Sequence, residues 1–201
     1  MLAKQTMLVK EKFCKIFFTF FFIFFLFSSL ASAGIRDELI KKIKTTNTLS
    51  FNFEQKIKNK KQTGSCDIKY PKKINCNYND SFKKRLVSNG KTLVVIQKRY
   101  KKILYYYPLK KTPLYFLLDK EYLIKFVSNS IMLETNKKFF QFRIKEDKKE
   151  LEIFFDKKTL DLKGWKTKDI YKNDVEFLII NQKVNLPVDD KIFKIPSADN
   201  L

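Results

Sequence analysis

The sequence predicts a mainly β protein, an incomplete antiparallel β-barrel of about ten or eleven strands with an α-helical lid. Short runs of alternating apolar and polar residues recur about every ten residues and are separated by turn-forming residues. This rhythm is typical of an antiparallel meander or barrel. A leucine-rich segment with helical spacing, residues 112–123, interrupts the strands. Because a sheet of this length curls, a helix at this point can plug its open side.

Residues 1–33 have the three-part build of a secretory signal peptide. Lysines precede an apolar run of 12 residues, Ile16–Phe27. The run is short for a membrane-spanning helix, which needs roughly 20 residues, although an uncleaved anchor is the alternative. Small residues follow, and we expect cleavage near Ala33. The sequence therefore predicts one domain, residues 34–201, outside the cytoplasm.

The formal net charge is +21 at pH 7, which favours anionic partners such as phospholipid head groups or nucleic acid. Nearly all of the positive charge is lysine, whereas arginine is preferred for recognition of bases and phosphates. Residues Tyr105–Tyr107 are more typical of sheet packing than of base stacking. We therefore expect no nucleic-acid partner, and codon bias in an AT-rich genome also accounts for abundant lysine.

The chain contains no histidine. This removes the commonest general base, the commonest metal ligand, and every nucleophile that depends on a histidine. No carboxylate pair is evident in the sequence either. We therefore expect a protein without catalytic residues, cofactor or metal.

The first elements follow from periodicity. Residues 34 to about 48 have apolar residues at helical spacing, which predicts a helix. Residues 49–57 then alternate, with Phe51 and Phe53 on one side, which predicts a half-buried strand. Polar residues and Gly64 follow, and we expect the first hairpin loop between residues 58 and 64.

The next strands carry clear turn signals. Asn89–Gly90 is the preferred pair for a two-residue type I′ turn and is expected to join residues 85–88 to residues 91–97. A strand ending at Pro108 comes next. Thr112 is then expected to cap a helix with Pro113 at its first position, and a core helix and a movable lid are both open readings. Further strand-like segments cover residues 137–145, 151–156, 160–169, 175–186 and 190–200.

Cys66 and Cys76 are ten residues apart, which suits neither a zinc site nor a C-x-x-C redox motif. If the turn lies near Pro71, Cys66 faces Cys76 across a hairpin, and Ile68 faces Ile74. The sequence predicts a disulfide there, worth about 2 to 3 kcal/mol, with two buried free thiols as the alternative.

In their order along the chain, these motifs resemble those of the periplasmic outer-membrane lipoprotein carriers, the LolA family. The likeness rests on FNFEQ at residues 51–55, the segment from Gly64 to the Pro71 turn, and residues 86–96, 107–118 and 175–196.

The resemblance implies an unclosed β-barrel with a helical lid, a hydrophobic cavity for lipoprotein acyl chains, and no catalysis. It also implies a periplasmic carrier that is loaded by an inner-membrane ABC transporter complex and delivers to an outer-membrane acceptor or to the outer membrane itself. We expect a monomer. A related periplasmic β-sheet module for interaction or envelope assembly, without lipid cargo, is the alternative.

We expect the concave face to be the one that carries Phe51. In the family, an arginine tied to lid closure commonly precedes the turn proline, where this chain has Tyr70, which can bond a lid backbone but carries no charge. The predicted cavity and lid residues are Phe51, Phe53, Ile68, Tyr70, Ile74, Tyr78, Leu93, Val95, Tyr105, Leu114, Leu117 and Leu118.

Overall fold

The computed structural model describes residues 34–133, 137–146, 149–169 and 172–197. The chain divides into two units, Met1–Leu39 and Ile40–Leu201. In the first unit the described residues, 34–39, are helical, and the helix continues to residue 45. All other described elements belong to the second unit.

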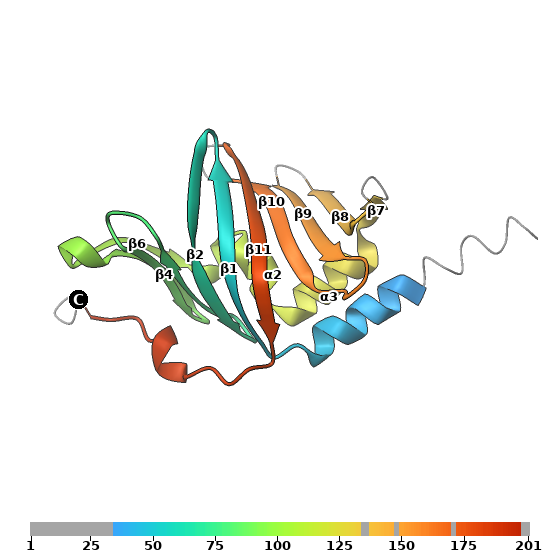
Figure 1. Cartoon of the computed structure of the whole chain (residues 1–201), viewed down its shortest axis with the longest axis horizontal. Coiled ribbons are helices and arrows are strands. Elements are labelled where there is room, and N and C mark those ends of the chain that lie inside the picture. Colours follow the sequence, from blue (N-terminus) through green and yellow to red (C-terminus); the bar gives the residue numbers. More distant parts are fainter. Residues whose placement is uncertain (1–33, 134–136, 147–148, 170–171, 198–201) are drawn as a thin grey trace, which may run out of the picture. The chain divides into compact units, whose positions relative to one another are not determined.

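Eleven strands of the second unit form one antiparallel sheet (Figure 1). The strand order is β6-β5-β4-β3-β2-β1-β11-β10-β9-β8-β7, and the outermost strands β6 and β7 do not pair, so the sheet is not closed. The prediction of an incomplete antiparallel barrel of ten or eleven strands is confirmed. The strands are β1 (Thr48–Ile57), β2 (Lys60–Lys69), β3 (Lys73–Tyr78), β4 (Lys84–Asn89), β5 (Thr92–Gln97), β6 (Lys102–Pro108), β7 (Ile131–Leu133), β8 (Phe139–Glu146), β9 (Lys149–Asp156), β10 (Leu162–Lys168) and β11 (Asp174–Val184).

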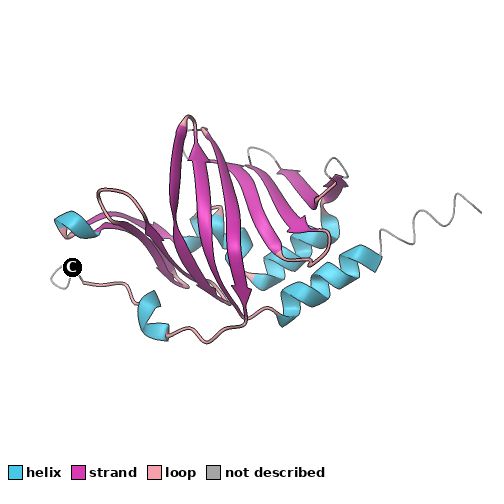
Figure 2. Ribbon diagram, viewed as in Figure 1, coloured by secondary structure: helices cyan, strands magenta, loops and turns pink. Residues whose placement is uncertain are grey.

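Two α-helices connect β6 to β7 and lie behind the curved sheet in the view of Figure 2. They are α2 (Leu114–Leu118) and α3 (Lys120–Asn129), and the single residue Asp119 separates them. Within the described ranges the chain also forms three 3-10 turns: η1 (Lys98–Tyr100), η2 (Leu109–Lys111) and η3 (Asp190–Phe193). Among the described residues, no helix is long and apolar enough to cross a membrane.

The first hairpin loop is shorter than the sequence predicted. Ile57 pairs with Lys60, so only Lys58 and Asn59 form the turn, and Lys58 takes a positive φ of 52°. The polar residues 60–63 are strand residues. They can be polar because β3 pairs with β2 only from Gly64 onward, so this part of the β1–β2 ribbon extends past its neighbour into solvent.

The predicted two-residue turn at Asn89–Gly90 has the right length but is displaced by one residue. β4 ends at Asn89 and β5 begins at Thr92, so the turn residues are Gly90 and Lys91. The Asn89 side chain supports the turn, because its Oδ1 accepts hydrogen bonds from the backbone N–H groups of Lys91 and Thr92 at 3.0 Å each.

Three other expectations need correction. Thr112 does not cap α2, because its hydroxyl donates to the carbonyl of Leu109 at 2.8 Å. The last segment contains η3 and no strand within the described residues up to 197, and β7, which follows α3, was not predicted. η3 forms because Asp189 caps it by accepting from the N–H of Lys191 at 2.9 Å.

The inner face of the sheet, which is turned toward α2, carries a row of contacting aromatic rings. The ring of Phe53 lies 5.0 Å from Tyr78 and 4.7 Å from Phe177, and Phe177 stacks on Trp165 at 4.0 Å. The row thus crosses from β3 to β10 although β2 lies between β3 and β1. It can do so because β2 presents Gly64 at this level, between Phe53 and Tyr78.

The outer face of β4 and β5 has a separate core, made by Val87, Val94 and Ile96. The C-terminal segment covers it, since Ile195 packs against this cluster and Phe193 is buried. Polar bonds hold the segment in place. Arg85 donates to the carbonyl of Ile192 at 2.5 Å, and Asp190 accepts from Lys69 and Lys73 at 2.7 and 2.9 Å.

The β2–β3 hairpin has the predicted register, with Cys66 opposite Cys76 and Ile68 opposite Ile74. The two Sγ atoms are 2.00 Å apart and form a disulfide. The bond joins neighbouring strands, and all four side chains are buried.

Gly64→Ala should destabilise the fold, because an added Cβ would lie 2.1 Å from the carbonyl oxygen of Asn77 and 2.7 Å from the ring of Phe53. We expect the free energy of unfolding to fall by about 1 to 3 kcal/mol, measured by urea denaturation. Gly34→Ala is the control, since its added Cβ meets nothing within 4 Å. An unchanged urea midpoint for Gly64→Ala would show that the aromatic row does not need this glycine.

Candidate functional site

A cavity of about 480 Å³ lies between the inner face of the sheet and α2. Its walls are mostly apolar side chains from β3, β4, β5, β6, β9, β10 and β11, and α2 closes one side. This volume is in the range of sites that bind small apolar ligands. The lining residues are Gln55, Ile74, Cys76, Tyr78, Leu86, Leu93, Val95, Tyr107, Lys111, Thr112, Pro113, Leu114, Leu117, Leu151, Trp165, Thr167, Lys168, Asp169, Val175 and Phe177.

Polar residues of the sheet line the cavity at one end of the strands. Tyr78 ends β3, Lys168 ends β10 and Val175 lies at the start of β11, so the cavity reaches the end of the sheet where these strands meet their turns. Lys168 and Asp169 lie there too, with Gln55 near the end of β1. An apolar ligand with a polar head could therefore keep its head at this edge and its tail under α2.

Tyr78 is held at this edge by two contacts. Its hydroxyl donates to Oε1 of Gln55 at 2.9 Å, and the Nζ of Lys84 lies 3.7 Å from its ring centre. Burial raises the pKa of Tyr78, so the ring stays neutral, and burial lowers the pKa of Lys84. Tyr78 is thus a fixed, uncharged end to the apolar wall.

Helices α2 and α3, which we call the lid because α2 closes one side of the cavity, are anchored to the β2–β3 turn through Lys72. Its backbone N–H donates to the carbonyl of Leu118 at 2.8 Å, and its Nζ pairs with Oδ2 of Asp119 at 3.0 Å. Asp119 is buried and also caps α3, accepting from the N–H groups of Glu121 and Tyr122 at 3.1 and 3.4 Å. One carboxylate therefore joins α2, α3 and the sheet.

Both partners of this ion pair have shifted pKa values. The hydrogen bond with Asp119 raises the pKa of Lys72. Burial alone would raise the pKa of Asp119, but hydrogen bonds from Lys72 and from the N–H of Tyr122 outweigh it and hold the pKa below its ordinary value. The pair is therefore charged at neutral pH.

The model of the outer membrane lipoprotein carrier protein family, LolA, matches residues 44–196. This chain belongs to the LolA family. The match covers every strand of the sheet, the lid helices and η3. The family is that of the outer membrane lipoprotein carrier proteins. A search of curated proteins finds no match.

Solved structures with a similar fold have little sequence identity with this LolA-family chain. An uncharacterised conserved protein from Thermus thermophilus has a TM-score of 0.51 and 7% identity, over 82% of this chain and 94% of that one. A LolA superfamily protein from Nitrosomonas europaea has a TM-score of 0.42 and 7% identity, over 79% and 97%. The MucA/MucB complex of Pseudomonas aeruginosa gives 0.48 and 9%, over 80% of this chain and 60% of that one.

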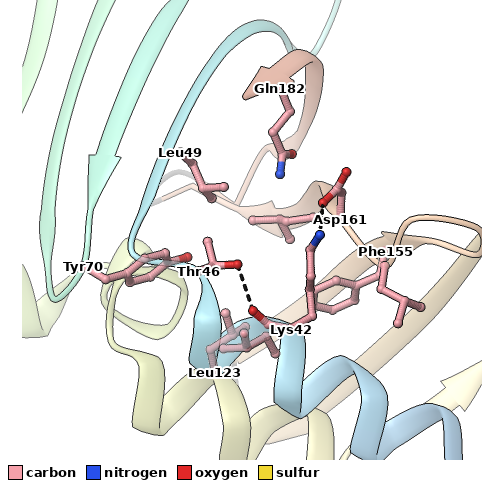
Figure 3. Close-up of a pocket in the computed structure, with 11 residues that line it drawn as sticks. Lys42, Thr46, Leu49, Tyr70, Leu123, Phe155, Asp161 and Gln182 are labelled. Carbon is pink, nitrogen blue, oxygen red and sulfur yellow. Dashed lines mark hydrogen bonds and ion pairs between the residues drawn. The ribbon is translucent and has the colours of Figure 1, made fainter. Parts of the chain in front are cut away.

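Tyr70 stands where the LolA resemblance leads us to expect an arginine (Figure 3). It lies beside α3, because the Nζ of Lys120 is 5.4 Å from the centre of its ring. It lines a second cavity of only about 20 Å³ with Leu49, Leu123 and Phe155. Its N–H donates to the carbonyl of Asn47 at 2.9 Å, and burial raises its pKa. The backbone bond from the β2–β3 turn to α2 comes from Lys72, whose N–H donates to the carbonyl of Leu118.

Polar contacts border the small cavity on the side of the N-terminal helix. Lys42 pairs with Asp161 at 3.0 Å, and the hydroxyl of Thr46 donates to the carbonyl of Lys42 at 2.8 Å (Figure 3). This end of the sheet is therefore nearly filled, unlike the edge that carries Tyr78.

The structure brings six of the predicted site residues together around the large cavity: Ile74, Tyr78, Leu93, Val95, Leu114 and Leu117. Cys76, of the disulfide, lines it too. Tyr105 is half exposed on the edge strand β6 and stacks on Tyr107, which lines the cavity, at 5.7 Å. The remaining predicted residues on the sheet and α2 are buried but do not line it: Phe51, Phe53, Ile68 and Leu118.

Sequence reasoning missed the half of the cavity wall that β9, β10 and β11 supply. Leu151, Trp165, Val175 and Phe177 line the cavity. Alternation places Val175 and Phe177 on one face of a strand, but only the pairing of Gln55 with Phe177 shows that this face continues the inner face of β1. The Lys72–Asp119 pair was missed as well, since nothing in the sequence links two residues 47 positions apart.

Asp119→Asn should loosen the lid without removing the helix cap, because asparagine caps as well as aspartate but carries no charge. We expect lower hydrogen-exchange protection in α2, with α3 still protected. Asp119→Ala removes the cap as well and should cost α3 about 1 kcal/mol more. Equal protection of α2 in Asp119→Asn and the unaltered chain would mean that the ion pair does not hold the lid.

The lid anchor should also depend on pH. Because the pKa of Asp119 is lowered in the folded state, its stabilisation is present above the ordinary aspartate pKa of about 3.9 and is lost as pH falls through the lower folded value. Protection factors of α2 should therefore decrease in this acid range for the unaltered chain and change less for Asp119→Asn. A parallel decrease in both proteins would assign the effect to other carboxylates.

Proposed function

We propose that this LolA-family chain is a periplasmic carrier that binds the acyl chains of lipoproteins in the large cavity and ferries them from the inner to the outer membrane. The observation that carries the proposal is the cavity of about 480 Å³, with an apolar wall and a lid helix over it. In a family of lipoprotein carriers, an apolar cavity of this kind fits the acyl part of the cargo.

The energetics of acyl binding suit a transient carrier. Each buried CH₂ group contributes about 0.8 kcal/mol, so burying only part of an acyl chain in the cavity is enough for tight binding. Among the lining residues, Leu86, Val95 and Leu114 are half-buried and could contact a chain directly. The polar edge near Lys168 and Asp169 suits the glyceryl and peptide part of the cargo.

Release requires that the closed lid compete with cargo. A ligand shifts a lid equilibrium only by its different affinity for the two states. In this chain the closed state gains the Lys72–Asp119 ion pair and the Lys72–Leu118 backbone bond. We infer that Lys72 has the role that the resemblance led us to expect of an arginine two positions earlier.

The remaining steps follow from the same proposal. Residues 1–33 act as a signal peptide cleaved near Ala33, which leaves residues 34–201 as one periplasmic domain. The carrier is a monomer that receives cargo from an inner-membrane ABC transporter complex. It delivers the cargo to an outer-membrane acceptor or to the membrane itself.

A related interaction or envelope-assembly module without lipid cargo is the competing function. Its specific support is the unpaired edge strand β6, where Tyr105 and Tyr106 are exposed and a partner strand could add to the sheet. Such a module has no need of an apolar cavity beneath a lid. The two functions therefore differ in whether the cavity takes up an apolar ligand.

The purified protein should take up an apolar fluorescent probe, and an acylated peptide should displace it. Val95→Trp fills the cavity from β5 and should weaken probe binding by about tenfold or more. Tyr106→Trp is the control, since Tyr106 is exposed and pairs with Val94, which belongs to the outer-face core. If the unaltered protein takes up no probe, the carrier function is wrong.

A further inference from the structure

Two large aromatic side chains are exposed side by side in the turns at one end of the strands. Phe82, in the β3–β4 turn, is 44% exposed and Tyr100, in η1, is 58% exposed. Their ring centres are 6.1 Å apart. Both turns are basic, and we call Phe82, Lys83, Arg99, Tyr100, Lys101 and Lys102 the rim patch.

Backbone hydrogen bonds join the two turns of the rim patch. The N–H of Arg99 donates to the carbonyl of Phe82, and the N–H of Lys98 donates to the carbonyl of Lys83, both at 3.3 Å. Lys83 and Lys101 take positive φ angles of 50° and 47° where the two turns reverse. The two turns are therefore joined by backbone bonds, and each carries an exposed ring.

The positive charge of the rim patch is not neutralised within the protein. All four of its cationic residues are exposed, and in the described part of the chain none of them forms an ion pair. Asp80 is the carboxylate of the same turn, and it accepts from the N–H of Lys84 at 2.9 Å. Lys98, next to the patch, donates to Asn77. Arg99 donates to the carbonyl of Ser81 at 3.3 Å, and its guanidinium lies 6.0 Å from the ring centre of Tyr100. The patch thus has exposed cations without carboxylate partners around two exposed rings.

The rim patch lies at the end of the strands to which the large cavity extends. In an antiparallel sheet of this order, the β1–β2, β3–β4, β5–β6 and β10–β11 connections all lie at the same end of the strands. Tyr78, at the end of the cavity wall, is four residues before Phe82. In Figure 1, η1 is the short green helix at the far end of β6.

We propose that the rim patch is a membrane-docking surface that binds anionic lipid head groups and inserts Phe82 and Tyr100 at the interface. Exposed lysines near an anionic surface attract it over a Debye length, and aromatic rings partition to the head-group level. The patch has both features. Docking in this way would bring the open edge of the cavity to the lipid surface.

A lipid surface fits these residues better than an acidic protein does. Three of the four cations are lysines, which act as point charges, and the two rings lie outside the protein with no pocket built around them. The inference rests on the proposed function, because a carrier must bring its cavity to a membrane. The inference adds that this protein itself binds the head groups of membrane lipids.

The test is co-sedimentation of the exported protein with vesicles of phosphatidylcholine, alone or mixed with phosphatidylglycerol. Using exported protein ensures that residues 1–33 are in the state in which the cell leaves them. We expect binding only to the anionic vesicles, and weaker binding as salt is raised. Lys101→Glu with Lys102→Glu should lower the partition coefficient by about tenfold or more, and Phe82→Ser with Tyr100→Ser by about fivefold.

Matched controls lie elsewhere on the sheet. Lys91→Glu with Lys110→Glu makes the same charge change at exposed residues of the opposite edge, and Tyr106→Ser removes an exposed ring of similar accessibility. These variants should bind vesicles nearly as the unaltered protein does. Equal losses in the patch and control variants would overturn the proposal, because net charge alone would then explain binding.

Probe uptake separates this proposal from the carrier function. Patch variants that lose vesicle binding but still take up the apolar probe support docking by the patch. Vesicle binding that depends on the patch without any probe uptake would retain the docking surface and reject the carrier function. Absence of binding to anionic vesicles at low salt would overturn the proposal, and specific binding of an acidic protein by the same residues would then assign the patch to a protein partner.

Discussion

The contact between the ring of Phe53 and the bare backbone of Gly64 is the constraint on which the inner face depends. Because β2 has no side chain at this position, Phe53 reaches across it to Tyr78, and on its other side it stacks on Phe177. Trp165 extends the row to β10. Two halves of an unclosed sheet thus share one apolar wall, and the large cavity lies along that wall under α2.

The two ends of this wall differ in how they are closed. At one end the β2–β3 turn is tied to the lid by Lys72 and Asp119, and the neighbouring cavity around Tyr70 is nearly filled. At the other end the cavity reaches the edge of the sheet, beside exposed aromatic and basic residues. The cavity is therefore bordered by basic residues at one end of the strands and by α2 at the other. The C-terminal segment covers the outer face of β4 and β5, so that this face contributes no second apolar site there.

Local physics made parts of this arrangement predictable. The alternation around Phe53, the Cys66–Cys76 register and the apolar face of Leu114 and Leu117 each depend on neighbours close in sequence, and the structure has all three. Turn details failed where a side chain competed with the backbone, as Asn89 and Thr112 do. The Lys72–Asp119 ion pair was not predicted, because an ion pair between distant residues leaves no periodic signal in the sequence.

By itself the sequence determined the class of fold, the approximate number of strands, the disulfide register and the likeness to a carrier family, because periodicity and short-range pairing are properties of neighbouring residues. Only the tertiary structure decided which face is concave and which residues line the cavity. That decision depends on β1 pairing with β11, more than a hundred residues away, which makes Val175, Phe177 and Trp165 continuous with Ile74 and Tyr78. Pairing between distant strands is set by the packing of the whole inner face, and no stretch of sequence contains it.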